Sequence, residues 1–273
     1  MINTVYTPVT VRSVTLGLGR PKICVPLTGT SPASLEQQLK VLAQLDPRDF
    51  DLIEWRADCY EPLKGCYAGS DRSDIVTSGV LMGAADLIRR YFPQVPLLFT
   101  IRTSNEGGCF DVTTEDYADL NTRAASLGQI DLIDVEYFTM GSSLASLLGS
   151  IHSLGKPVVL SSHDFEQTPS DDEMLSRLQA MQSTGADIIK LAVMPRCSLD
   201  TMRLMNITHK MRHEHATCPL ITMSMGPIGA ISRLSGELTG SCVTFAAAAQ
   251  TSAPGQMPAG IVHEVLELLK VQG

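Results

Sequence analysis

Short apolar runs, rich in β-branched residues, recur along the whole chain and are separated by longer segments with helical character. Runs of this kind are typical of strands that are buried on both faces of a parallel sheet. They cover residues 23–28, 50–55, 97–101, 132–136, 158–161, 188–193, 220–223 and 242–245. About eight such units, each followed by a helical segment, predict a closed α/β barrel of the (β/α)8 type, the TIM barrel.

The segments between the runs fit the helices and turns of such a barrel. Residues 34–45 begin with a serine and carry leucines at helical spacing, and residues 170–183 open with acidic side chains that complement a helix dipole. Residues 9–16 alternate like a short β-hairpin that would cover the bottom of the barrel, whereas the polar residues 60–78 predict a long loop. We expect one domain over residues 1–273, with residues 1–22 as an N-terminal hairpin extension.

Composition excludes several classes of protein. A formal net charge of -8 argues against a nucleic-acid surface, which needs clustered lysine and arginine. The seven cysteines form no Cys-x-x-Cys pair, which favours free thiols in a reducing, cytoplasmic compartment. The N-terminus does not have the pattern of a secretory signal, and no apolar stretch approaches the roughly 20 residues of a membrane span, so we expect no membrane partner.

Lys190 interrupts the apolar run 188–193, where a buried strand should carry no charge. Burial disfavours an ammonium group, and a neutral amine is the nucleophile that forms an imine with a ketone. A structural ion pair, or a side chain that reaches the strand end, explains the same position equally well. Its place in the sequence therefore leaves both interpretations open.

Polar residues also follow most of the other runs, at the ends where the active sites of TIM barrels lie. Their types suggest a chemistry: His163 titrates near neutral pH and can move protons, and Glu106 can position its imidazole. The arginines, with no phosphate-binding motif nearby, suggest a small hydroxylated keto acid as substrate, with Arg233 the best candidate to bind a carboxylate. We also expect the arginines to favour a neutral Lys190 by like charge. The polar residues at the mouth are Glu54, Arg56, Asp58, Arg102, Glu106, Asp134, Glu136, His163, Asp164, Lys190, Arg233, Ser252 and Gln256.

In combination these residues resemble type I 3-dehydroquinate dehydratase, the Schiff-base enzyme of the shikimate pathway of aromatic amino-acid biosynthesis. The resemblance covers most of the chain, and the order and spacing of its motifs make it specific. The motifs are Glu54-Trp-Arg-Ala-Asp58, Phe99-Thr-Ile-Arg102 followed by Glu106-Gly-Gly108, Ser161-Ser-His-Asp-Phe165, Asp187-Ile-Ile-Lys-Leu-Ala-Val-Met-Pro195, Ile231-Ser-Arg-Leu-Ser-Gly-Glu237 and Ser252-Ala-Pro-Gly-Gln256.

The resemblance implies a role for each of these positions. Lys190 would form the imine with the C3 ketone of 3-dehydroquinate, His163 would abstract the C2 proton and assist loss of the C1 hydroxyl, and Glu106 would support the histidine. Arg233 would bind the substrate carboxylate. Hydroxyl contacts would come from Glu54, Arg56, Arg102, Ser252 and Gln256, and apolar walls from Met223, Met225 and Phe245. A homodimer without a metal or organic cofactor is also implied.

Two other functions remain open from the residues alone. A barrel aldolase would use the same lysine, although a sugar-phosphate substrate calls for a backbone phosphate cradle near the last strands, where residues 226–229 offer only a weak candidate. A non-catalytic barrel that binds a keto acid or a protein partner would need neither Lys190 nor His163. A histidine group at 209, 213 and 215 has zinc-like spacing in part, but a solvated helix face explains it better.

Overall fold

A computed structural model describes residues 6–67, 74–248, 253 and 255–270. Its main sheet contains eight parallel strands in the order β10-β3-β4-β5-β6-β7-β8-β9. The strands are β3 (Lys22–Leu27), β4 (Leu52–Arg56), β5 (Leu97–Thr100), β6 (Leu132–Glu136), β7 (Val158–Asp164), β8 (Ile188–Val193), β9 (Leu220–Ser224) and β10 (Val243–Phe245). The backbone N–H of Cys242 donates to the carbonyl of Leu220 at 2.8 Å and links the two ends of the sheet. The predicted TIM barrel is confirmed.

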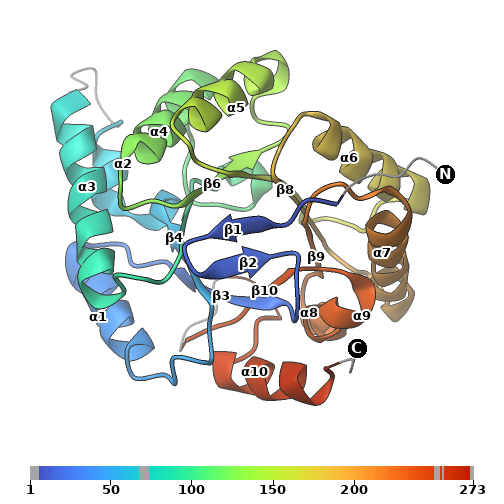
Figure 1. The fold of residues 1–273 in the computed structure, drawn as a ribbon. Helices are drawn as coiled ribbons and strands as arrows, with labels where there is room; N and C mark the ends of the chain where they lie inside the picture. Colours follow the sequence, from blue (N-terminus) through green and yellow to red (C-terminus); the bar gives the residue numbers. More distant parts are fainter. Residues whose placement is uncertain (1–5, 68–73, 249–252, 254, 271–273) are drawn as a thin grey trace.

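Helices surround the strands (Figure 1). They are α1 (Pro32–Leu42), α2 (Glu61–Gly65), α3 (Asp74–Tyr91), α4 (Thr114–Ser126), α5 (Leu144–Ser153), α6 (Asp171–Ser183), α7 (Ser198–Lys210), α8 (Ala230–Leu234), α9 (Gly236–Thr239) and α10 (Ala259–Leu268). No helix in the described residues is both long and apolar enough to cross a bilayer.

An antiparallel hairpin of β1 (Val9–Val11) and β2 (Val14–Leu16) lies across one end of the barrel, as Figure 1 shows. Val11 and Leu16 share one apolar cluster with Leu52, Leu132 and other residues from the first positions of the barrel strands. The hairpin therefore closes the end at which the strands begin, as predicted, and leaves the opposite end as the mouth.

Each central strand alternates between two surroundings, because successive side chains of a strand point to opposite faces. On β6, Ile133 and Val135 join the large cluster beneath the helices, whereas Leu132 joins the cluster inside the barrel. The inward positions change character along the strand, from Leu132 at the closed end to buried Asp134 and Glu136 nearer the mouth. The barrel interior is thus apolar at one end and charged at the other.

The limits of some elements differ from the prediction. Helix α1 begins at Pro32 instead of residue 34, because Ser31 caps it and forms a capping box with Ser34, and it ends at Leu42. Strand β7 extends to Asp164, so His163 lies on the strand itself.

The predicted loop over residues 60–78 is wrong for its described part. Helix α2 occupies Glu61–Gly65 and α3 starts at Asp74. Thr77, Leu81 and Ile88 are buried at helical spacing, and this packing outweighs the polar composition of the segment.

Candidate active site

Lys190 lies in the middle of β8 and points into the barrel, where its side chain is 5% exposed. Its Nζ lies 3.5 Å from Asp134 Oδ2 on β6 and 3.8 Å from Glu54 Oε1 on β4. It also lies 4.4 Å from the centre of the Phe245 ring on β10. The nearest ionic partners of the amine are therefore carboxylates, whereas the sequence analysis expected arginines to act on it. These carboxylates stabilise a cation at Nζ, as an ammonium or as a protonated imine.

His163 and Glu106 form a buried pair at the mouth. Glu106, in the turn Ser104–Glu106 after β5, accepts from the backbone N–H of His163 at 3.0 Å, and its Oε2 lies 2.8 Å from Nδ1 of the same residue. Burial and the nearby Arg102, Lys190 and Arg56 lower the pKa of His163 well below its usual range. These surroundings favour the neutral imidazole, whereas the sequence analysis expected His163 to titrate near neutral pH.

Burial also acts on the carboxyl of this pair. It raises the pKa of Glu106 to about 8; Arg102 opposes the shift, and the carboxylates of Glu136 and Asp134 add to it. Glu106 is thus a group whose charge changes slightly above neutral pH. Its ionised form stabilises an imidazolium at His163, and its protonated form does so less.

Arg102 is held at the base of the mouth by carboxylates from β6. Its Nη2 donates to Asp134 at 2.7 Å, and its Nη1 donates to Glu136 at 3.0 Å and to the hydroxyl of Ser161 at 3.0 Å. Asp134 also accepts from Ser161 at 2.7 Å. This network fixes Asp134 beside Lys190 with its lone pairs directed at defined donors.

The other two arginines have different surroundings. Arg56, at the end of β4, makes a bidentate pair with Asp58 at 2.7 and 2.8 Å. Arg233, on α8, is 2% exposed, and burial lowers its pKa to about 10, which leaves it charged at neutral pH. One of its nitrogens lies 3.7 Å from the sulfur of Met223. Arg56 is therefore oriented by an ion pair with Asp58, and Arg233 contacts the sulfur-bearing side chain of Met223 at the cavity wall.

The residues to which the resemblance gave a role all line one cavity at the mouth, as far as they lie within the described part of the chain. The lining consists of Glu54, Arg56, Arg102, Glu106, Gly107, His163, Phe165, Lys190, Ala192, Met223, Met225, Arg233, Phe245, Ala253 and Gln256. Ser252, also predicted, lies outside the described residues. Polar groups from distant segments thus meet around Lys190, as the strand-end argument predicted.

The sequence did not indicate the role of Phe165 in this region. Phe165 stacks on His163 with ring centres 6.4 Å apart and planes 23° apart. Glu136 is fully buried and accepts from Arg102 and from Thr103. Glu136 was predicted among the polar residues at the mouth, and its place two residues after Asp134 on the same strand directs its side chain to the same face.

Two further predictions concern residues that are not part of this cavity lining. Asp164, predicted among the polar residues at the mouth, accepts hydrogen bonds from the backbone N–H groups of Glu166 and Gln167 and so shapes a turn. His209 and His213 lie on the outer face, with ring centres 4.3 Å apart and both side chains exposed.

Comparisons with known proteins agree with this geometry. Residues 23–272 match the model of the type I 3-dehydroquinase family. The chain belongs to the type I 3-dehydroquinase family. It is a 3-dehydroquinate dehydratase, a hydro-lyase of the shikimate pathway, and the resemblance found in the sequence is confirmed.

Its relatives are similar over nearly their whole length. The 3-dehydroquinate dehydratase of Listeria welshimeri is 42% identical over 97% of this chain and 98% of its own, and that of Bacillus licheniformis is 41% identical over 96% and 97%. The structure of the type I enzyme from Clostridium difficile, solved with covalently modified comenic acid, has a TM-score of 0.87 at 37% identity and covers 97% of this chain and 98% of its own.

Proposed function

We propose that Lys190 is the amine that forms the imine in this enzyme and that His163, supported by Glu106, moves the protons. The observation that carries the proposal is the placement of a buried lysine amine and a neutral, carboxylate-linked imidazole around one cavity. A type I enzyme converts 3-dehydroquinate to 3-dehydroshikimate and water, and this pair supplies both groups that the reaction needs.

The steps follow from the surroundings of each group. Lys190 attacks the C3 ketone as a free amine and forms a carbinolamine. Uptake of one proton lets the hydroxyl of the carbinolamine leave as water, and Asp134 and Glu54 stabilise the resulting protonated imine by charge. The cationic imine withdraws electrons from C2, and neutral His163 removes a C2 proton. The resulting enamine expels the C1 hydroxyl, which takes the proton back from His163, and hydrolysis of the imine releases the product.

Recognition of the substrate is assigned to the rest of the lining. Arg233 binds the carboxylate in a bidentate manner, since it stays charged at neutral pH and lines the cavity. Hydroxyl groups contact Glu54, Arg56, Arg102, Ser252 and Gln256. Met223, Met225 and Phe245 form the apolar walls against the ring.

The carboxylate role of Arg233 makes a prediction about binding. Arg233→Ala should raise the KM by roughly 10- to 100-fold, the loss expected for a charge-assisted pair of about 1.5–3 kcal/mol, with a smaller effect on kcat. Steady-state kinetics with 3-dehydroquinate measure the split. Arg233→Lys keeps the charge but loses the bidentate geometry, so its KM should lie between those of Arg233→Ala and the native enzyme. An unchanged KM in Arg233→Ala would refute the carboxylate assignment.

We also propose a homodimer, supported by exposed apolar side chains on neighbouring elements that a monomer would leave in water. Leu199 and Met202 on α7, and Ile231 on α8, are each about half exposed. Light scattering at micromolar concentration tests the oligomeric state.

The free thiols support a cytoplasmic location. The continuous apolar cluster beneath the helices supports one domain over residues 1–273.

Turnover of 3-dehydroquinate, compared with that of a phosphorylated ketose, tests the function as a whole. We expect dehydration of the first compound and no cleavage of the second. Cleavage of the ketose phosphate would favour the aldolase alternative, and binding without turnover would favour a keto-acid carrier.

A further inference from the structure

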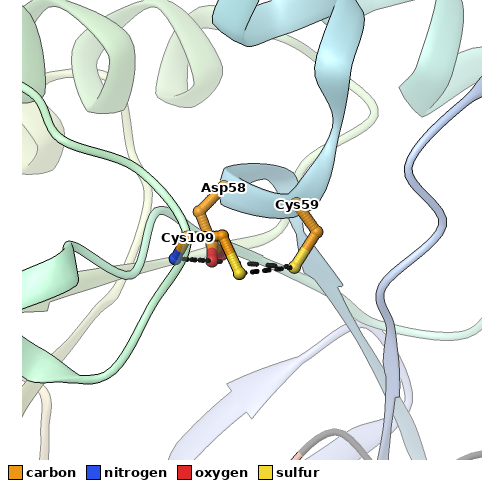
Figure 2. Close-up of side chains that lie close together, drawn as sticks. All are labelled: Asp58, Cys59 and Cys109. Carbon is orange, nitrogen blue, oxygen red and sulfur yellow. Dashed lines mark hydrogen bonds between the residues drawn. The ribbon is translucent and has the colours of Figure 1, made fainter.

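Two cysteines meet beside the mouth of the barrel, and the function proposed above does not use them. Cys59 follows β4, in the turn Ala57–Cys59, and Cys109 follows the turn that carries Glu106. Figure 2 shows that their side chains point toward one another across the gap between the two segments. The sulfur atoms lie 3.9 Å apart, and the side chain of Cys109 is exposed. A small approach of the two sulfurs would bring them to the about 2.05 Å of a disulfide bond.

Asp58 connects these thiols to the active site. Its Oδ2 accepts from the guanidinium of Arg56 at 2.8 Å and from the backbone N–H of Cys109 at 3.2 Å, and it lies 3.7 Å from the sulfur of Cys59. The carboxylate that orients Arg56 is therefore also a partner of both cysteines (Figure 2). A movement of the thiols that shifts Asp58 therefore also shifts the guanidinium of Arg56.

We propose that Cys59 and Cys109 are a modification site, which a low-molecular-weight disulfide such as oxidised glutathione converts to an intramolecular disulfide that weakens substrate binding through Asp58 and Arg56. The effect on binding rests on the role of Arg56 proposed above. The formation of the bond does not.

The chemistry balances as two successive thiol–disulfide exchanges. Cys109 attacks first as its thiolate, because its side chain is exposed, whereas burial and Asp58 raise the pKa of Cys59 to about 12. This step breaks the glutathione disulfide and releases one glutathione thiol. Cys59 then loses its proton and attacks the sulfur of Cys109, which releases the second glutathione. Two protein thiols are oxidised, and one glutathione disulfide is reduced to two thiols.

A metal site is the competing use of these side chains. In the part of the chain that the structure describes, Asp58, Cys59 and Cys109 are the group that could offer three ligands to one ion. Both oxygens of Asp58 already bind the Arg56 guanidinium, whose positive charge lies next to any ion placed there. Two thiols alone fall short of the four ligands that a closed zinc site needs. The geometry favours the disulfide.

Peptide mapping tests whether the bond forms. The full-length enzyme is incubated with oxidised glutathione and a chelator, its remaining thiols are alkylated, and it is digested with trypsin. Cys59 and Cys109 are the only cysteines of the tryptic peptides 57–64 and 103–123. We expect a linked pair of these two peptides that a reductant separates. Glutathione attached to Cys109 with no linked pair would overturn the proposal.

Kinetics on the same samples test the effect on binding. Oxidation should raise the KM for 3-dehydroquinate by about tenfold, the loss expected when one charge-assisted contact weakens, with a smaller change in kcat. Reduction of the disulfide should restore the native KM. Cys59→Ser and Cys109→Ser should each abolish the response, whereas Cys197→Ser, at an exposed cysteine elsewhere, should keep it. A linked pair with an unchanged KM would overturn the coupling to Arg56, while failure of the reduced enzyme to turn over substrate would count against the proposed function instead.

Discussion

On β6, Leu132 packs among apolar side chains at the closed end of the barrel, whereas Asp134 and Glu136 on the same face of the strand bind Arg102 near the mouth. The neighbouring β8 repeats the contrast, with Ile188 in the apolar cluster and Lys190 beside carboxylates. A few residues of strand thus separate a region built for stability from a region built for chemistry. Arg102 and Lys190 can be buried at the mouth because carboxylates lie beside them.

The comparison predicts that substitutions at the mouth reduce turnover, whereas substitutions at the closed end reduce stability. The largest effect is expected at Lys190. Lys190→Ala should lower kcat by at least roughly 10⁴-fold, the scale for loss of a covalent nucleophile, because no other amine takes its place beside Asp134. Stopped-flow or steady-state assays measure this loss. Lys190→Met, which fills the space without an amine, should be equally inactive, and turnover by either variant near the native rate would remove Lys190 from its role.

His163→Ala should have the next largest effect. The rate should fall by roughly 10²- to 10⁴-fold, the range for a general acid–base group, while formation of the imine survives. Single-turnover kinetics combined with borohydride trapping separate the two steps. Phe165→Leu is a matched control, since it removes the ring stacked on His163 and keeps the imidazole. A native rate in His163→Ala would refute the assignment.

The raised pKa of the Glu106 carboxyl predicts that kcat/KM decreases at low pH. Since its pKa is raised to about 8, Glu106 is protonated at lower pH and then stabilises the imidazolium less, so kcat/KM should fall as the pH drops through about 8. Glu106→Gln resembles the protonated form. It should be slower by roughly 10- to 100-fold at pH 9, and the fall near pH 8 should disappear. If kcat/KM of Glu106→Gln still falls as the pH drops through about 8, the fall does not belong to Glu106.

The closed end should behave in the opposite way. Leu132→Ala removes a buried side chain from the cluster beneath the hairpin and should cost about 2–5 kcal/mol in the free energy of unfolding. The folded variant should keep kcat/KM close to native. Urea denaturation and steady-state assays check the two expectations, and a large loss of kcat/KM with native stability would break the comparison between the two ends.

The alternation of strands and helices carried enough information to predict the barrel, because buried parallel strands are almost wholly apolar. Lys190 stood out for the same reason. What the sequence could not supply was the partner of each charge. Whether Lys190 faces arginines or carboxylates depends on which residues of β4 and β6 reach the same depth inside the barrel, and this follows only from the register of the strands.

The segment 60–78 shows a second limit. Its composition is polar, but α3 forms there because Thr77, Leu81 and Ile88 pack inward. Likewise, the lowered pKa of His163 follows from burial among cations, which the spacing of the motifs does not report.

The most direct test of the account is to reduce the native enzyme with borohydride in the presence of 3-dehydroquinate and to map the modified residue by mass spectrometry. We predict one adduct per chain, on Lys190, absent when substrate is omitted and absent in Lys190→Met. An adduct on another lysine, or full turnover without any trapped adduct, would contradict the central claim that this buried amine carries the reaction.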